Sequence, residues 1–244
     1  MSLVVSTVLK GVVIIGADTR AVQRSGDCVH YDDTIKRIVP FSSSAAVAFC
    51  GDTNISDFLL VSDFLRKFRE TYFKEHSGVI CIHDLAKTIL DESLRKNPDS
   101  DIIYSVAGFS KGFCNGEVYV VSTESGSCES VVKFGDFGAA CIGISDLANS
   151  FMNNDVCYDL LSFKEGVDLV RTCINSNIIG FRYRKEQLVG GHCELLAFNE
   201  LSGEHGWVDG GRDSYYIDSY TDFPLDFDDL PVLGDEEIHI EGFH

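Results

Sequence analysis

A run of apolar residues that ends in a carboxylate constrains this sequence more than any other feature. Residues 11–17 read Gly-Val-Val-Ile-Ile-Gly-Ala and are followed directly by Asp18. A run of Val and Ile of this length predicts a strand that is buried on both faces. A carboxylate at the end of such a strand is costly unless a cation or hydrogen-bond donors meet it. Asp18 is therefore expected either to form a local turn or to have a partner elsewhere in the chain.

The charge of the chain limits the classes of partner. Its 244 residues are 45% hydrophobic, which is enough for one large core. Asp and Glu number 38 against 20 Lys and Arg, so the formal net charge is -18. A surface of this sign is unsuited to nucleic acid or to an anionic membrane, and we expect neither as a partner. No apolar run reaches the roughly 18 residues of a membrane span, and residues 1–9 do not resemble a secretory signal.

The cysteines predict an intracellular protein. Nine are scattered between Cys28 and Cys193 without a Cys-x-x-Cys motif. This pattern is typical of reduced thiols in the cytoplasm or nucleus rather than of a disulfide framework. The seven histidines do not cluster with the cysteines at ligand spacing, so we expect no metal site and no other cofactor.

The order of the predicted elements indicates an α+β chain. Residues 162–165 read Ser-Phe-Lys-Glu, a capping box that predicts the start of a helix. Strands come in runs and helices in pairs, which favours antiparallel sheets with helices on their outer faces over alternating βαβ units. The periodicities predict strands at 3–9, 12–17, 26–31, 35–39, 45–50, 102–109, 117–122, 130–134, 139–144, 193–198 and 206–208, and helices at 58–72, 82–94, 145–152 and 163–178.

The composition changes after residue 212. Residues 213–244 hold ten Asp and Glu, no Lys or Arg, and several aromatic residues. A solvated acidic tail would have this charge but would not need the aromatic residues. An acidic docking arm that contacts a neighbouring protein would use both. The predicted organisation is one domain over residues 1–212 and an extension over residues 213–244.

Five short motifs in a consistent order resemble the β-type subunits of the proteasome, which are N-terminal-nucleophile hydrolases. The similarity covers residues 2–208, and the first motif is most like that of the trypsin-like subunits. It implies a four-layer αββα sandwich, with two antiparallel sheets between two helix layers. The motifs are the acidic strand end at 16–21, the segment of the catalytic lysine at 34–38, the glycine turn at 48–53, the stretch opening the third helix at 142–145, and the loop after the fourth helix at 185–191.

The resemblance implies a set of catalytic positions. The family uses an N-terminal Thr whose own α-amino group, with a pKa of about 8, serves as the base. A lysine paired with an aspartate supports the nucleophile, and a glycine N–H contacts the oxyanion. In this sequence the nucleophile position falls on Ser2, the aspartate on Asp18 and the lysine on Arg37. Gly51 is the oxyanion glycine, and Ser145 is the supporting serine.

Several positions depart from the family pattern. Arg37 cannot exchange a proton as lysine does, because its pKa stays above about 12. A slip of one residue would restore Lys36, but it would turn the apolar face of the strand outward. Glu186 stands for a second aspartate and Val189 for a serine. Phe49 replaces a small residue that opens the substrate pocket, and we expect it to fill that pocket.

The sequence therefore predicts a non-catalytic β-type subunit in which Asp18 and Arg37 form a structural ion pair. It would occupy one position in the seven-membered β ring of a 20S core particle and contact other β-type subunits and an α-type ring. The implied role is ubiquitin-dependent protein degradation in the cytoplasm and nucleus. The start at Met1, with Asp18 sixteen residues after Ser2, suits the unprocessed subunits of that family. The alternative is an active N-terminal-nucleophile peptidase that uses Ser2 after removal of Met1.

Overall fold

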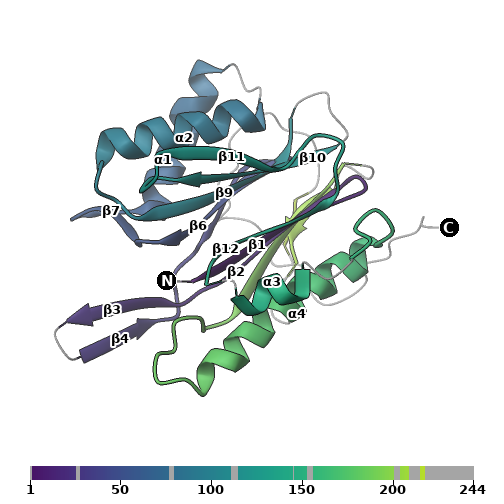
Figure 1. Cartoon of the computed structure of the whole chain (residues 1–244). Helices are drawn as coiled ribbons and strands as arrows, with labels where there is room; N and C mark the ends of the chain where they lie inside the picture. The colour runs from purple at the N-terminus through teal and green to yellow at the C-terminus, as the bar shows by residue number, and fades with distance from the viewer. Residues whose placement is uncertain are drawn as a thin grey trace.

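The structure of the chain is a computed structural model (Figure 1). It describes residues 2–25, 28–76, 80–110, 115–144, 146–152, 156–200, 204–208 and 215–217. The described helices are α1 (Val61–Glu75), α2 (Ile82–Lys96), α3 (Asp146–Met152) and α4 (Phe163–Arg182). The described strands are β1 (Leu3–Leu9), β2 (Val12–Asp18), β3 (Ala21–Ser25), β4 (Cys28–Asp32), β5 (Ile38–Ser42), β6 (Ala45–Gly51), β7 (Asn54–Ser56), β8 (Leu59–Leu60), β9 (Ile102–Phe109), β10 (Gly116–Ser122), β11 (Ser127–Val132), β12 (Gly138–Gly143), β13 (Cys193–Asn199), β14 (Glu204–Trp207) and β15 (Tyr215–Ile217).

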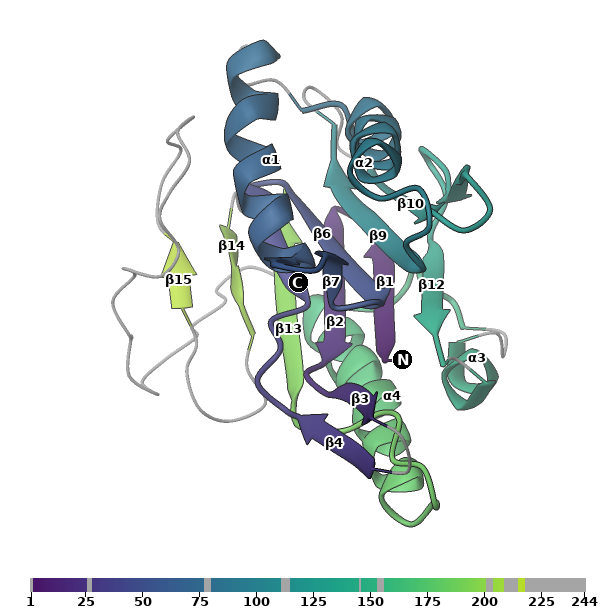
Figure 2. The ribbon, with the colours of Figure 1, turned by 90° about the vertical axis from the view of Figure 1, so that its left-hand side faces the viewer.

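Two large sheets form the centre of the fold. The six-stranded sheet has the order β12-β1-β2-β13-β14-β15, and the five-stranded sheet has the order β11-β10-β9-β6-β5. Every described strand pair is antiparallel. Figures 1 and 2 show α1 and α2 over the outer face of the five-stranded sheet, and α3 and α4 beside the six-stranded sheet on its far side. The expected α+β class with antiparallel sheets is confirmed.

Strands β1 and β2 are buried on both faces, as their apolar runs predict. Every residue of both strands is buried. Alternate side chains such as Val4 and Ile15 join the core between the two sheets, while their neighbours Leu3 and Ile14 join the core beneath α4. Because successive side chains of a strand point to opposite faces, strands covered on both sides cannot alternate between apolar and polar residues.

Helix α4 covers the six-stranded sheet closely. Its first turn carries the predicted capping box: the Ser162 hydroxyl accepts the N–H of Glu165, and the Glu165 carboxylate accepts the N–H of Ser162. A Cβ on Gly16 of β2 would lie only 2.5 Å from a methyl group of Ile174. The Gly16 position therefore lets α4 approach the strand that ends at Asp18.

Two short hairpins stand out from the body. The β3–β4 hairpin is mostly exposed, and all five residues of β4 are exposed. The smaller β7–β8 hairpin carries Phe58, whose side chain is 99% exposed. Figure 1 shows both hairpins on the same side of the molecule as the N-terminus.

The sequence predicted most of these elements but missed four of them. Strands β1 and β9 have the predicted bounds, and the four helices lie where the periodicity placed them within a few residues. The unpredicted strands are β3, β7, β8 and β15, which are short and lie in hairpins or at a sheet edge. Apart from the β15 backbone, the extension over residues 213–244 lies outside the described residues.

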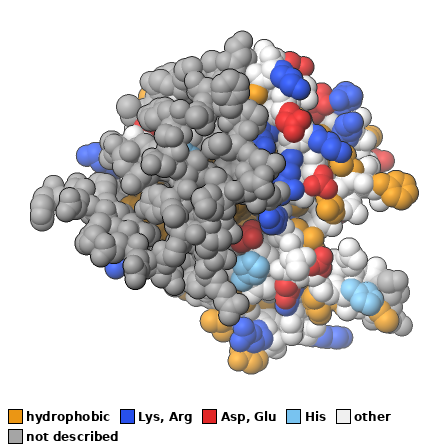
Figure 3. Space-filling model, turned by 180° about the vertical axis from the view of Figure 1, so that it is seen from behind, with side chains coloured by type: hydrophobic (Ala, Val, Ile, Leu, Met, Phe, Trp, Pro, Cys, Tyr) orange, Lys and Arg blue, Asp and Glu red, His pale blue; other side chains and the backbone are white. Residues whose placement is uncertain are grey.

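Charges of both signs lie on the described part of one face of the molecule (Figure 3). On the face seen in Figure 3, Lys and Arg side chains are interspersed with Asp and Glu side chains. Within the part of the chain that the structure describes, no helix is long and apolar enough to cross a membrane.

Candidate functional site

Asp18 is the last residue of β2, and its side chain is fully buried. Its Oδ1 accepts the N–H of Leu3 at 2.8 Å, and its Oδ2 accepts the N–H of Gly190 at 2.9 Å. Burial raises the pKa of the Asp18 carboxyl from 3.8 to about 6, although the charge of Arg37 and these N–H bonds oppose the rise. The partners of Asp18 therefore include two backbone amides that are distant in sequence, rather than a local turn alone.

Arg37 is fully buried, whereas its neighbour Lys36 is exposed. The structure therefore has the register that places Arg37, not Lys36, inside the site. Arg37 Nη2 donates to the carbonyl oxygen of Arg20 at 2.5 Å, and Nε and Nη1 have no hydrogen-bond partner. Burial lowers the pKa of Arg37, and the charge of Asp18 raises it.

The expected ion pair between Asp18 and Arg37 is not a direct contact. Among the described residues, no hydrogen bond or salt bridge joins the two side chains, and they interact only through longer-range attraction. The physical reason is competition for partners: Asp18 binds the backbone amides of Leu3 and Gly190, and Arg37 binds the Arg20 carbonyl.

Ser2 is held at the start of β1. Its side chain is fully buried, and its Oγ has no hydrogen-bond partner. The Ser2 carbonyl oxygen accepts the N–H of Ile144 at 2.9 Å, just beyond β12. Gly143 faces this carbonyl with a φ of 85°, and a Cβ at Gly143 would lie 2.0 Å from the oxygen. Residue 2 is thus fixed beside Leu3, whose N–H binds Asp18.

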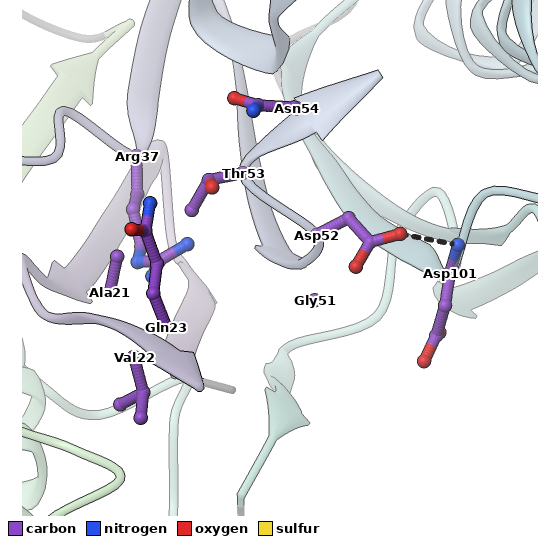
Figure 4. Close-up of a pocket in the computed structure, with 9 residues that line it drawn as sticks. All are labelled: Ala21, Val22, Gln23, Arg37, Gly51, Asp52, Thr53, Asn54 and Asp101. Carbon is purple, nitrogen blue, oxygen red and sulfur yellow. Dashed lines mark hydrogen bonds between the residues drawn. The ribbon is translucent and has the colours of Figure 1, made fainter. Parts of the chain in front are cut away.

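Gly51 ends β6 at the edge of a pocket of about 350 Å³ (Figure 4). Its φ is 93°, and a Cβ there would lie 2.2 Å from the carbonyl oxygen of Asp101. Asp52 and Asp101 are joined by two hydrogen bonds, from Asp52 N–H to Asp101 O at 2.8 Å and from Asp101 N–H to Asp52 Oδ2 at 3.1 Å. The pocket is lined by Ala21, Val22, Gln23, Arg37, Gly51, Asp52, Thr53, Asn54 and Asp101.

Four further positions differ from the simplest expectation or lie outside the described residues. Phe49 does not line this pocket; it packs in the core beneath α1 and α2, because its side chain points to the helix-covered face of the sheet. Glu186 lies at the surface, where it pairs with Arg24 at 2.8 Å. Val189 is buried in the core beneath α4. Ser145 lies outside the described residues.

Sequence reasoning missed a network of loop contacts that supports Asp18. Arg20 makes a two-bond contact to Asp33, at 2.6 and 2.7 Å, and donates to Gln187 at 3.0 Å. A Cβ at Gly190 would lie 2.3 Å from the Arg20 guanidinium. Arg20 therefore links the segments that deliver the Gly190 N–H to Asp18. The Gly190-Gly191 pair was the only signal in the sequence for this close approach.

The arrangement brings together Asp18, Arg37 and Gly51, with Ser2 tied in through Leu3. The carboxyl group can hold or release a proton near neutral pH, because its pKa is raised to about 6. A guanidinium can supply charge and hydrogen bonds, but its pKa is too high for proton exchange. The site is therefore suited to electrostatic support rather than to proton transfer through residue 37.

Comparisons with known proteins identify the family. The model of the family described as proteasome subunit matches residues 3–188. A search of curated proteins found no match. The family match spans β1 to the loop after α4 and includes Asp18, Arg37 and Gly51. The chain belongs to the proteasome subunit family, whose members form the core particle that degrades proteins.

Proposed function

We propose that the chain is a non-catalytic β-type subunit of the 20S core particle, with residues 1–212 forming a four-layer αββα domain. Two observations support the fold assignment: helices lie outside both sheets, and apolar clusters lie between the sheets and beneath each helix layer. Such a subunit contacts other β-type subunits and an α-type ring in the cytoplasm and nucleus. It shapes the chamber in which related chains cut peptides.

The observation that best supports a non-catalytic subunit is the position of Arg37. Its guanidinium is buried at the expected lysine position and donates to the Arg20 carbonyl. It makes no direct bond to Asp18. In the family mechanism a lysine at this position supports the alkoxide-like state of the nucleophile. An arginine with two guanidinium nitrogens that lack a hydrogen-bond partner does not reproduce that arrangement.

The proposal is tested by Ser2→Ala in the assembled particle. We expect the rates of hydrolysis of peptides with acidic, basic and hydrophobic residues at the cleavage site to stay unchanged. Covalent probes that react with N-terminal nucleophiles should label the catalytic subunits of the same particle, which serve as the internal control, and leave this chain unlabelled. Loss of one peptidase activity with assembly intact would contradict the proposal.

The active peptidase is the second candidate, because Ser2 Oγ has no partner and lies next to the residue that binds Asp18. It requires the free amine that removal of Met1 would expose. Intact mass of the native protein decides this point. A chain that retains Met1 or carries an acetylated Ser2 has lost the base and excludes the candidate.

A further inference from the structure

Four cations gather beside the C-terminal end of α4, although the chain as a whole carries a net charge of -18. Arg182, Arg184 and Lys185 are exposed, and Arg24 of the β3–β4 hairpin reaches the same place by pairing with Glu186 at 2.8 Å. Figures 1 and 2 show the hairpin beside this end of α4. We call Arg24, Arg182, Arg184 and Lys185 the basic patch.

The basic patch lacks enough counter-ions of its own. Among the described residues, no salt bridge involves Arg182, Arg184 or Lys185. The neighbouring carboxylate of Glu186 forms its salt bridge with Arg24. The exposed Arg95 and the half-buried Arg171 differ, since Arg95 pairs with Glu92 and Arg171 with Asp168. The favourable placement of a cation at a helix C-terminus accounts for Arg182, but not for Arg184 and Lys185, which follow the helix.

Apolar side chains lie among these cations. Tyr183 is 83% exposed between Arg182 and Arg184. Val29 pairs with Arg24 across the hairpin and is 43% exposed, and Tyr31 is 42% exposed on the same face of the hairpin. A surface of this kind suits a segment that alternates carboxylates with aromatic and aliphatic side chains.

We propose that residues 218–244 of the same chain bind to the basic patch. This segment holds nine Asp and Glu and no Lys or Arg, and Tyr220, Phe223 and Phe227 lie among its carboxylates. It follows β15, which ends at Ile217 on the edge strand of the six-stranded sheet. Extended, its 27 residues reach up to about 90 Å, so its length allows contact anywhere on the molecule. The tether also raises the effective concentration of the segment at the patch.

The balance of charge favours this site over the rest of the surface. Residues 1–212 carry a net charge of -8, which is -18 less the -10 of residues 213–244. An acidic segment is repelled by most of such a surface and attracted to a cluster of four cations, of which only Arg24 has a salt-bridge partner among the described residues. The inference goes beyond the proposed function, because it holds whether or not Ser2 is catalytic.

Zero-length carbodiimide crosslinking of the full-length chain tests the proposal, with the linked residues mapped by mass spectrometry. The reagent joins a lysine amine to a carboxylate in contact with it. We expect Lys185 to crosslink to residues 218–244 at least roughly fivefold more than Lys164, an exposed lysine of α4 beside Glu165. The variant R182Q/R184Q should remove this excess. The excess should also disappear in about 0.5 M NaCl, which is on the order of three times the physiological ionic strength and screens exposed charges.

A matched control and two contrary outcomes complete the experiment. Arg95→Gln removes an exposed arginine that is paired with Glu92, and it should leave the Lys185 yield unchanged. Equal yields at Lys185 and Lys164 would overturn the proposal in favour of a solvated tail. Crosslinks only between chains, detected by mixing isotope-labelled and unlabelled protein, would overturn it in favour of a site on a second copy.

Discussion

At the scale of single residues, the site is dominated by two buried ionisable groups that bind backbone rather than each other. Asp18 accepts two amide N–H groups, and Arg37 donates to a carbonyl. Desolvation is the largest influence on the pKa of both groups, raising that of Asp18 and lowering that of Arg37. The charge of each group opposes this shift and stabilises the ionised form of the other without a direct bond. Because the pKa of Asp18 differs between the folded and unfolded chain, the stability of the fold depends on pH.

We expect Asp18 to reduce stability as the pH rises from about 4 to about 6. The pKa of Asp18 is raised from 3.8 to about 6, so its contribution to stability is full below pH 3.8 and is lost as the pH rises through the folded-state value. Over that range the free energy of unfolding should fall by about 3 kcal/mol relative to Asp18→Asn, which does not titrate. Urea unfolding of both proteins at several pH values measures the difference.

Other titrating groups are common to both proteins and cancel in this comparison. Asp99→Asn replaces an exposed carboxylate outside the site, serves as the control and should leave the pH profile of the wild type unchanged. Parallel profiles for the wild type and Asp18→Asn would contradict the raised pKa.

At the scale of elements, the turn after β6 brings a site residue, Gly51, into a contact that a regular strand conformation would not allow. Gly51 ends β6 with a φ of 93° and turns the chain toward β7, directly against the Asp101 carbonyl. The sequence indicated a turn here from Gly51-Asp52-Thr53, but not the close approach of residue 101. That contact joins segments about fifty residues apart, and only the pairing of β6 with β9 creates it.

Gly51→Ala is expected to destabilise the fold more than Gly126→Ala. Both glycines have positive φ, at 93° and 61°, and an alanine in that region costs about 1–2 kcal/mol. At Gly126 nothing lies within 4 Å of an added Cβ, whereas at Gly51 it would lie 2.2 Å from Asp101 O. The clash with the Asp101 carbonyl should add about 2 kcal/mol to the loss of stability caused by Gly51→Ala. Denaturant midpoints of the two variants provide the comparison, and equal losses would show that the clash is relieved.

At the scale of the whole molecule, the described surface is that of a protein that assembles with others. Several large apolar side chains are exposed, and Phe58 and Leu160 are each more than three-quarters exposed. Membership of the proteasome subunit family supplies the reason, because its members assemble with other proteasome subunits. An isolated chain would leave these side chains in water.

Phe58→Ser should weaken assembly without weakening the fold. The phenyl group is 99% exposed, so its removal should change the free energy of unfolding by less than about 0.5 kcal/mol. Incorporation into a particle of several related chains should fall, which native mass spectrometry of co-expressed subunits measures. Asp57→Ser on the same hairpin is the matched control. Unchanged incorporation of Phe58→Ser would show that Phe58 lies outside the subunit contacts.

The sequence by itself determined the buried strands, the helices and the family. Val and Ile runs and helical periods depend on local order, so β1, β9 and the capping box of α4 could be predicted closely. The burial of Arg37 rather than Lys36, directly before β5, also followed from the apolar pattern of that strand. The short strands β3, β7, β8 and β15 could not be predicted, since pairing with a partner strand rather than local propensity defines them.

Only the tertiary structure decided the partners of the site residues. Asp18 binds Gly190 across 172 positions of sequence, and Arg20 connects Asp33 with Gln187. Such contacts depend on which loops meet at the end of β2, and no pattern of residue types encodes them. Opposite charges suggested a direct ion pair, but buried amides and carbonyls must also be satisfied, and their positions are fixed only when the sheets pack.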